Sequence, residues 1–317
     1  MSACCGPKRP SESPRQSQGR WRNKKKRATR ARLPGNLIEI GGGPFIMGTD
    51  DEAGFPEDGE GPTREVTLSP FRIGAHAVTN AEFSRFVRAT GYKTEAEQFG
   101  WTFVFHLFVP QSTAARIDRV VEITPWWWPV EGAYWAKPEG PTSDLKGRGT
   151  HPAVHLSWND TSAYCDWIGG RLPTEAEWEF AARGGLETRT YPWGDDLTPD
   201  GTHRCNIWQG TFPDLNEESD GFVGTAPVDS FSPNGYGLYN VSGNVWEWCA
   251  DWFSTDYHRT SDSRNPRGPS RGEAKAMRGG SYLCHDSYCN RYRVAARSAN
   301  TPDSSTGNLG FRLAADL

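Results

Sequence analysis

Residues 171–184 read Arg-Leu-Pro-Thr-Glu-Ala-Glu-Trp-Glu-Phe-Ala-Ala-Arg-Gly and contain the clearest helix signal of the chain. Thr174 followed by Glu177 predicts a capping box at the start of this helix, because each side chain can bond the other residue's free backbone N–H. Trp178 begins an apolar face at helical spacing, and Gly184 is typical of the residue that ends a helix. This stretch therefore predicts one short, well-capped helix.

The rest of the chain predicts few other regular elements. A second helix begins at Thr79-Asn80 and ends at Gly91, and a third begins near residues 159–160. Short strands are expected at residues 38–40 and 45–48, joined by a glycine turn, and along residues 64–73, with Val66, Leu68 and Phe71 facing inward. With 35 Gly and 23 Pro in 317 residues, the sequence predicts a single, loop-rich α+β domain over residues 35–317, in which residues 92–150 form an aromatic, unassigned insert.

The N-terminal segment, residues 1–34, differs from the remainder in charge. It holds eleven Lys or Arg against one acid, a charge of +10, whereas the whole chain carries −4. A basic and nearly apolar-free segment cannot bury enough surface to fold, so it is predicted to be disordered. It lacks the apolar core of a signal peptide, and no later stretch is long enough to span a bilayer. We expect a monomeric, cytoplasmic protein whose folded domain binds neither nucleic acid nor membrane.

Two of the seven cysteines stand out. Cys284 and Cys289 lie five positions apart, a spacing that faces the same side neither on a strand nor on a helix, so residues 285–288 must form a turn if the sulfurs are to meet. Residues 292–296 are predicted as a strand behind this turn. Two thiolates alone disfavour tetrahedral zinc and suit a soft ion such as Cu(I), or a redox disulfide. Two inert core thiols are the alternative.

The sequence around this pair resembles the formylglycine-generating enzymes, also called sulfatase-modifying factors. The resemblance rests on residues 278–293, RGGSYLCHDSYCNRYR, with residues 308–312, NLGFR, and on the upstream runs RLPTEAEWE and GNVWEW. It covers residues 35–317. It implies an irregular α+β domain of the sulfatase-modifying-factor or C-type-lectin-like type, with few short helices and strands. The two upstream runs also occur in a wider superfamily and indicate the fold, whereas the cysteine pair indicates the reaction.

The resemblance implies an oxidoreductase that activates sulfatases. Cys284 and Cys289 would hold Cu(I), and an extended or unfolded sulfatase segment with the motif Cys-x-Pro-x-Arg would bind its cysteine there as a third thiolate. Dioxygen would then oxidise that cysteine to formylglycine. Carried over by position, Ser281 belongs with the catalytic cysteines. The residues implied to line the substrate or oxygen pocket are Trp246, Tyr288, Arg297, Ser305 and Asn308.

The resemblance also implies two structural calcium sites. Each set mixes one carboxylate with amide or backbone oxygens, which suit a hard cation. The sets are Asn206, Ile207, Asp220 and Phe222 for the first site, and Asn240, Gly243, Val245 and Glu247 for the second.

Several alternatives remain at this point. Core packing of Trp246 and a buried structural ion pair of Arg297 would explain those residues equally well. An iron-dependent sulfoxide synthase would need a histidine-rich metal site, and the seven histidines show no helical pair of that kind. A non-catalytic lectin-like binding module would not need the cysteine pair. A thiol–disulfide oxidoreductase normally carries its cysteines two residues apart at a helix start. Cys4 and Cys5 are assigned no catalytic role, and Cys205 and Cys249 are predicted as buried apolar side chains.

Overall fold

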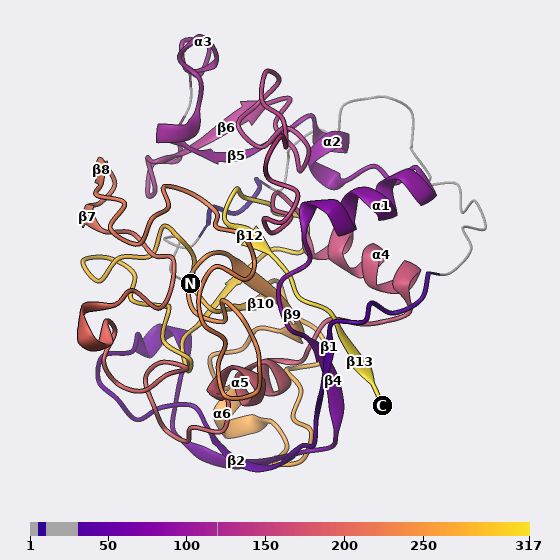
Figure 1. The fold of residues 1–317 in the computed structure, drawn as a ribbon, viewed down its shortest axis with the longest axis vertical. Coiled ribbons are helices and arrows are strands. Elements are labelled where there is room, and N and C mark those ends of the chain that lie inside the picture. Colours follow the sequence, from indigo (N-terminus) through magenta and orange to yellow (C-terminus); the bar gives the residue numbers. More distant parts are fainter. Residues whose placement is uncertain (1–5, 11–30, 119) are drawn as a thin grey trace.

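The computed structural model describes residues 6–10 and 31–317, with the exception of residue 119. Its helices are short, and loops connect most of them (Figure 1). The α-helices are α1 Asn80–Thr90, α2 Glu95–Phe99, α3 Gln111–Ala114, α4 Trp158–Ile168, α5 Glu175–Arg183 and α6 Tyr257–Thr260. Single 3₁₀ turns are η2 Pro56–Asp58, η3 His106–Phe108 and η4 Pro199–Gly201.

The strands form two small sheets and three two-stranded ribbons. One sheet has the order β1-β4-β13, the second has the order β11-β10-β9-β12, and the ribbons are β2-β3, β5-β6 and β7-β8. The strands are β1 Leu37–Ile40, β2 Gly43–Met47, β3 Arg64–Leu68, β4 Phe71–Gly74, β5 Trp101–Phe105, β6 Trp127–Glu131, β7 Gly210–Thr211, β8 Leu215–Asn216, β9 Trp246–Trp252, β10 Lys275–Arg278, β11 Arg297–Asn300, β12 Leu309–Gly310 and β13 Ala314–Asp316. The fold is therefore the predicted loop-rich α+β type.

The capping predictions are confirmed in detail. Thr174 and Glu177 form the reciprocal capping box of α5, and Gly184 follows its last residue in a left-handed conformation. Helix α1 has the same arrangement between Thr79 and Gly91. The third helix, α4, begins one residue earlier than predicted, because Ser157 caps it and pairs with Asp160.

The strands predicted in the first part of the domain are confirmed in position. β1 and β2 lie on either side of the predicted glycine turn, and β1 pairs with β4 while β2 pairs with β3. The single strand expected over residues 64–73 divides into β3 and β4, which belong to different sheets. Val66, Leu68 and Phe71 are buried as predicted. Periodicity specifies the face of a strand, whereas its partner depends on packing.

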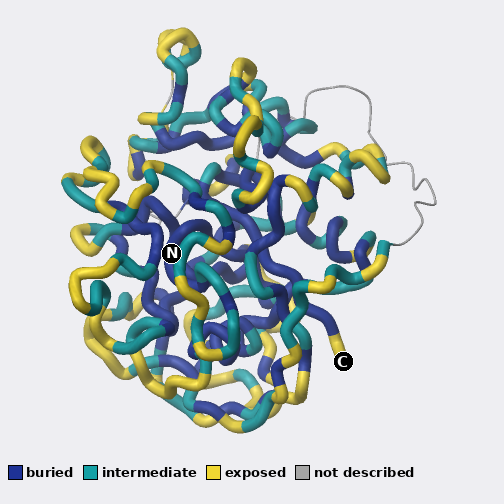
Figure 2. The backbone as a smooth tube through the Cα atoms, viewed as in Figure 1, coloured by how far each residue is buried: buried dark blue, intermediate teal, exposed yellow. Residues whose placement is uncertain are grey.

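Buried residues fill the centre of the molecule, and exposed residues follow the outer loops (Figure 2). The largest apolar cluster joins helices α1 and α4 to β9, and both Cys284 and Cys289 belong to it. The aromatic insert folds into α2 and the β5-β6 ribbon, which lie together at one end of the molecule (Figure 1). Among the described residues, no helix is long and apolar enough to cross a membrane.

A group of buried ion pairs, here called the ion-pair network, links α5 to β10 and β11. Arg278 contacts Glu175 at 3.6 Å and also pairs with Glu179, while Arg183 approaches Glu179 at 2.6 Å. Arg297 completes the network through Glu175 at 2.7 Å. Burial alone would raise the pKa of Glu179, but Arg183 and Arg278 outweigh it and hold that pKa at about 2. The carboxylates therefore stay charged, each neutralised inside the protein.

Part of the N-terminal segment lies against the domain. Residues 6–10 run beside β5 (Figure 1), and Gly6, Pro7 and Arg9 are buried. Near the other end of this segment, the Ala31 N–H donates to the Trp167 carbonyl at 3.2 Å. The expectation that residues 1–34 are disordered therefore does not describe residues 6–10.

Candidate active site

The site begins where β10 ends. Gly279 and Gly280 follow Arg278 with positive φ angles of 96° and 72°. A Cβ at Gly280 would lie 2.9 Å from the Tyr292 Cα and 3.0 Å from the Arg291 carbonyl, so a side chain has no room there. The glycine pair thus turns the chain sharply against residues 291–292 and starts the loop that carries both cysteines.

A tight turn brings the two sulfurs together, as the spacing predicts. The N–H groups of Cys289 and Tyr288 both donate to the His285 carbonyl, at 2.7 and 3.1 Å. The Cys284 and Cys289 Sγ atoms lie 3.3 Å apart, and both residues are almost completely buried. A disulfide bond measures about 2.05 Å, so these are two separate sulfurs. Residues 284–289 are called the cysteine turn below.

The expected strand at residues 292–296 is not present. These residues form turns, in which the Ala296 N–H donates to the Arg293 carbonyl at 3.0 Å, and β11 begins only at Arg297. The Val294 N–H donates to Thr190, which lies outside both sheets. The backbone N–H groups of Val294 and Ala296 therefore bond to turns and loops and not to a neighbouring strand.

Ser281 and Asn308 meet beside the cysteine turn. The Ser281 N–H points to the Cys284 Sγ at 3.4 Å, and the Ser281 hydroxyl accepts from the Asn308 amide at 2.9 Å. Thr306 donates in turn to the Asn308 Oδ1 at 2.6 Å. Residues that are 27 positions apart thereby form one neutral hydrogen-bonded row that ends at a cysteine sulfur.

Trp246 and Tyr288 enclose the same region. Trp246 is fully buried in the cluster that contains both cysteines, and its backbone N–H donates to the Asn308 carbonyl at 2.9 Å. Its indole N–H has no hydrogen-bond partner among the described residues. Tyr288 donates to the Leu283 carbonyl at 2.9 Å and stacks on Phe212 with ring centres 4.1 Å apart. Tyr288 therefore braces the cysteine turn from outside.

Arg297 belongs to the ion-pair network, the structural alternative named above. Besides its pair with Glu175, it donates to the carbonyls of Asp58 and Gly59 at 3.1 and 2.9 Å. Its guanidinium also lies over the ring of Tyr257. Arg297 thus holds the loop of η2 in place and acts on the site only through that loop.

That loop supplies Asp58, which with Arg291 of the segment after the cysteine turn forms a pair that the sequence analysis missed. The Asp58 carboxylate forms a buried ion pair with Arg291, whose Nη1 lies 3.8 Å from the Cys289 Sγ. Burial raises the pKa of Asp58 to about 6, although Arg291 opposes this shift. A guanidinium at this distance favours the thiolate form of a cysteine. No sequence signal connects residues that are 233 positions apart.

Ser305 faces the β5 strand. Its backbone carbonyl accepts from the Thr102 hydroxyl at 2.8 Å, and the two hydroxyls also lie 2.8 Å apart. The next residue, Thr306, is the one that bonds Asn308. The segment that carries Ser305 thus joins β5 to the row beside the cysteines.

Three members of the first predicted calcium set are in hydrogen-bond contact, and Asn206 is the neighbour of one of them. The Asp220 carboxylate accepts from the N–H groups of Ile207 and Phe222, both at 3.0 Å. The Asn206 Oδ1 is buried without a hydrogen-bond partner among the described residues. Burial raises the pKa of Asp220, as expected for a carboxylate without a full counter-charge. These oxygens suit a hard cation.

In the second predicted calcium set, an arginine already holds the carboxylate. The Glu247 carboxylate is bound through both oxygens by Arg312, at 2.6 and 2.7 Å, and it also accepts from the Trp178 indole at 2.7 Å. A guanidinium already neutralises its charge. Of the other members, Asn240 has an unpartnered buried Oδ1 among the described residues, and the Val245 side chain packs in a small apolar cluster.

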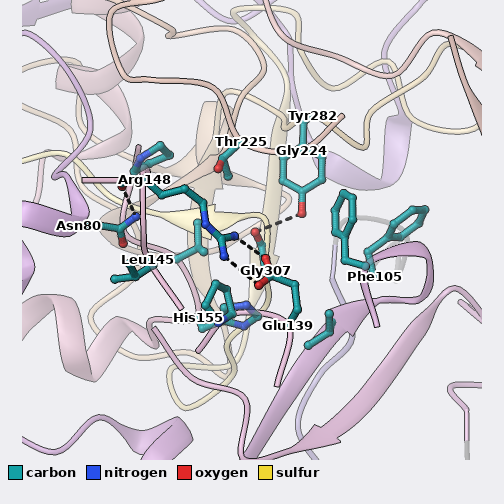
Figure 3. A pocket seen from close by; sticks show the side chains of 15 residues that line it. Asn80, Phe105, Glu139, Leu145, Arg148, His155, Gly224, Thr225, Tyr282 and Gly307 are labelled. Atoms are coloured by element: carbon teal, nitrogen blue, oxygen red, sulfur yellow. Dashed lines mark hydrogen bonds and ion pairs between the residues drawn. The ribbon is translucent and has the colours of Figure 1, made fainter. Parts of the chain in front are cut away.

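Two cavities border the site. One, of about 270 Å³, is shown in Figure 3. In its lining, the Arg148 guanidinium pairs with Glu139 at 2.9 Å, and the Tyr282 hydroxyl donates to the Gly307 carbonyl at 3.2 Å. The second, of about 260 Å³, is lined by His285 and Asp286 of the cysteine turn. The two cavities thus lie near opposite ends of residues 282–286.

The remaining described cysteines are structural. Cys165, Cys205 and Cys249 are buried and form no disulfide, as predicted for Cys205 and Cys249. Burial raises the pKa of all three thiols, which keeps them protonated and unreactive. Among the described cysteines, Cys284 and Cys289 are the ones whose sulfurs lie in contact.

Comparisons with known proteins agree with this arrangement. The model of the sulfatase-modifying factor enzyme 1-like domain matches residues 22–317. The chain is 61% identical over 283 residues to the formylglycine-generating enzyme of Thermomonospora curvata, covering 88% of this chain and 93% of that protein. Its identity to the formylglycine-generating enzyme of Streptomyces coelicolor is 58%, covering 91% and 92%.

Other relatives show the breadth of this group. A bovine relative, 46% identical with 88% and 87% of the two chains covered, is named inactive C-alpha-formylglycine-generating enzyme 2. The solved structure of PvdO from Pseudomonas aeruginosa is 27% identical, with a TM-score of 0.65 and coverage of 89% and 94%. Overall similarity thus establishes the fold, and the residues of the site must carry the argument for activity.

Proposed function

This chain belongs to the sulfatase-modifying factor enzyme family, and we propose that it oxidises the cysteine of a Cys-x-Pro-x-Arg motif in sulfatases to formylglycine, using Cu(I) and dioxygen. The names of its relatives support the reaction. The observation that carries the proposal is the pair of buried sulfurs 3.3 Å apart, which an inactive relative of the same fold would not require.

The residues of the cysteine turn fit a soft, low-coordinate ion. Cys284 and Cys289 offer two convergent sulfur donors, and among the described residues no group of three or more His, Cys, Asp or Glu side chains converges on one point. Two sulfurs alone suit Cu(I) better than tetrahedral zinc. Copper bound there would supply the electron-transfer chemistry that dioxygen needs in order to react with a thiol.

The protein's own groups prepare this site. The Ser281 N–H and the Arg291 guanidinium both point to the cysteine sulfurs, so they stabilise the thiolate form. Asn308 fixes the Ser281 hydroxyl, and Trp246 belongs to the apolar cluster that surrounds the pair. Water is thereby kept from the sulfurs, and the substrate cysteine has one defined approach.

A redox disulfide between Cys284 and Cys289 is the second candidate, because the same 3.3 Å approach would allow it. It predicts reversible loss of two thiols on oxidation and no change in an added peptide. The copper proposal predicts that the added peptide is converted and that the two thiols are not lost.

We also propose that Asn206, Ile207, Asp220 and Phe222 hold structural Ca²⁺. The unpartnered Asn206 Oδ1 and the buried Asp220 carboxylate support this set. Calcium should raise the melting temperature of the native protein, and Asp220→Asn should abolish that increase. A melting temperature that is the same with calcium and with chelator would contradict the proposal.

The reaction is tested with a Cys-x-Pro-x-Arg peptide, purified protein, Cu(I), oxygen and a thiol reductant. Mass spectrometry should show the peptide losing about 18 Da, because sulfur and two hydrogens leave and one oxygen enters. Cys284→Ser should abolish the conversion. A wild-type protein that binds copper and leaves the peptide unchanged would contradict the proposed function.

A further inference from the structure

The chain carries its own copy of the proposed substrate motif. Residues 5–9 read Cys-Gly-Pro-Lys-Arg, which matches Cys-x-Pro-x-Arg at every specified position. None of the other six cysteines is followed by proline at the second position and arginine at the fourth. The motif lies in the basic N-terminal segment, where the sequence analysis assigns no role to Cys5.

The arginine of this motif is bound as a ligand would be. Arg9 is only 4% exposed, and its guanidinium lies 4.1 Å from the ring centres of both Phe99 and Trp101. Its Nε donates to the Asp303 carbonyl and its Nη2 to the Trp101 carbonyl, both at 3.2 Å. Two aromatic faces and two carbonyls form a specific site for a guanidinium.

The backbone of the motif is held along the segment that precedes Asn308. The Arg9 N–H donates to the Ser304 hydroxyl at 2.7 Å, and the Asn300 amide donates to the carbonyls of Pro7 and Gly6 at 3.2 and 3.4 Å. Lys8, at an unspecified position of the motif, is exposed. The specified residues Pro7 and Arg9 are buried, as is Gly6.

Contacts lead from Gly6 to the cysteine turn. A Cβ built on Gly6 lies 3.2 Å from the Thr306 Cγ2, and Thr306 bonds the Asn308 amide group. Asn308 bonds Ser281, whose N–H points to the Cys284 Sγ. Cys5, which precedes Gly6 in the sequence, lies outside the described residues.

We propose that residues 6–9 occupy the substrate groove of their own chain, formed by Phe99, Trp101 and residues 300–306, and that this enzyme oxidises Cys5 to formylglycine. The inference rests on the proposed function, because it assigns a second substrate to the same site. It also assigns arginine recognition to Phe99, Trp101 and the Asp303 carbonyl. The arginine of a sulfatase Cys-x-Pro-x-Arg motif would bind to the same three groups when residues 6–9 are displaced.

The reaction at Cys5 balances with the reactants of the proposed function. The thiol and one Cβ–H give up two electrons to form a thioaldehyde, and an added thiol reductant supplies two more. Dioxygen takes up these four electrons and four protons and becomes two waters. One water then hydrolyses the thioaldehyde, so that the C–S bond breaks, an aldehyde forms and hydrogen sulfide leaves.

The first test measures the intact mass of the full chain after incubation with Cu(I), oxygen and a thiol reductant. Wild-type protein should lose about 18 Da, located at Cys5 by peptide mapping. Cys5→Ser and Cys284→Ser should show no loss. The rate constant should be independent of protein concentration, because the motif and the site belong to one molecule.

Arg9 provides the matched comparison. Arg9→Ala should slow the conversion of Cys5 at least about tenfold, because it removes two cation–π contacts and two hydrogen bonds. Lys8→Ala should leave the rate within about twofold, since the Lys8 side chain is exposed. Arg9→Ala should also lower the apparent KM for an added Cys-x-Pro-x-Arg peptide, because the groove is then less often occupied.

Failure of the Cys5 proposal can be distinguished from failure of the proposed function. If an added peptide is converted while Cys5 remains a thiol and Arg9→Ala leaves the peptide's KM unchanged, the inference is overturned and the proposed function stands. If neither the peptide nor Cys5 is converted by copper-loaded protein, both fail.

Discussion

Two regions that meet at the C-terminal end of β10 use their polar groups in opposite ways. In the ion-pair network, Arg278 and its neighbours neutralise one another, and both carboxylates are fully buried. Immediately after Arg278, the chain enters the row of Asn308 and Ser281, whose neutral hydrogen bonds end at the Cys284 sulfur. The ion-pair network uses charge to stabilise the fold. The Ser281–Asn308 row instead directs hydrogen-bond donors at the cysteine sulfur that would bind the metal.

This difference predicts that variants will separate activity from stability. Loss of a group in the neutral row should remove function from a folded protein. Loss of a charge in the network should instead lower the free energy of unfolding.

The largest effect is expected at the cysteine turn. Cys289→Ser should abolish formylglycine formation and copper binding, because one of the two sulfur donors is lost, while the melting temperature stays close to that of the wild type. Cys249→Ala is the matched control, since Cys249 is equally buried outside the turn. It should keep full activity at a cost of about 1 kcal/mol. An active Cys289→Ser protein would show that the pair is not the reactive centre.

The ion-pair network should respond in stability. Glu175→Gln leaves Arg297 buried without its counter-charge and removes one of the two carboxylates around Arg278, so the free energy of unfolding should fall by about 3–5 kcal/mol. Arg189→Ala breaks an ion pair whose members are both about half exposed and should cost less than about 1 kcal/mol. Urea denaturation measures both. Equal losses for the two variants would mean that the buried network does not stabilise the fold.

A smaller effect on activity is expected in the neutral row. Asn308→Ala should lower kcat/KM about 10- to 100-fold with little change in stability, because it frees the Ser281 hydroxyl beside the Cys284 sulfur. Combining it with Ser281→Ala should cost less than the product of the two single effects, since both act through one contact. Asn216→Ala, in the β7-β8 ribbon, serves as the control. Fully multiplicative effects would show that the two residues act independently.

The smallest effect concerns pH at the edge of the network. Burial raises the pKa of Asp251 from 3.8 to about 6, and its carboxylate accepts from the Glu175 and Gly268 N–H groups. Between about pH 4 and 6 the folded state therefore holds more protons than the unfolded state. The contribution of Asp251 to stability should decrease as pH rises through this window, by at most about 1.4 kcal/mol per pH unit.

The measurement is urea denaturation of the wild type and Asp251→Asn at pH 4.5 and pH 6.5. Because asparagine does not titrate, the variant should gain stability relative to the wild type at the higher pH. A difference between the two proteins that is constant with pH would show that the Asp251 pKa is not raised in the folded state.

Local features of this chain were predictable because the forces behind them act within a few residues. The Thr174 capping box, the glycine after each predicted helix and the turn between Cys284 and Cys289 all follow from backbone geometry over four or five positions. The same rules placed β1 to β4 correctly, whereas the strand expected at residues 292–296 is absent. They did not predict that β1 would pair with β4, because that choice depends on packing.

The sequence by itself determined the short capped helices, the α+β class, the paired cysteines and the motif at Cys5. Only the tertiary structure decided that Asp58 would pair with Arg291 beside Cys289, that Arg312 would take the Glu247 carboxylate, and that Arg9 would be buried. The reason is the same in each case. A charged side chain enters a protein interior only where folding brings a partner to it, and that partner can lie anywhere in the chain.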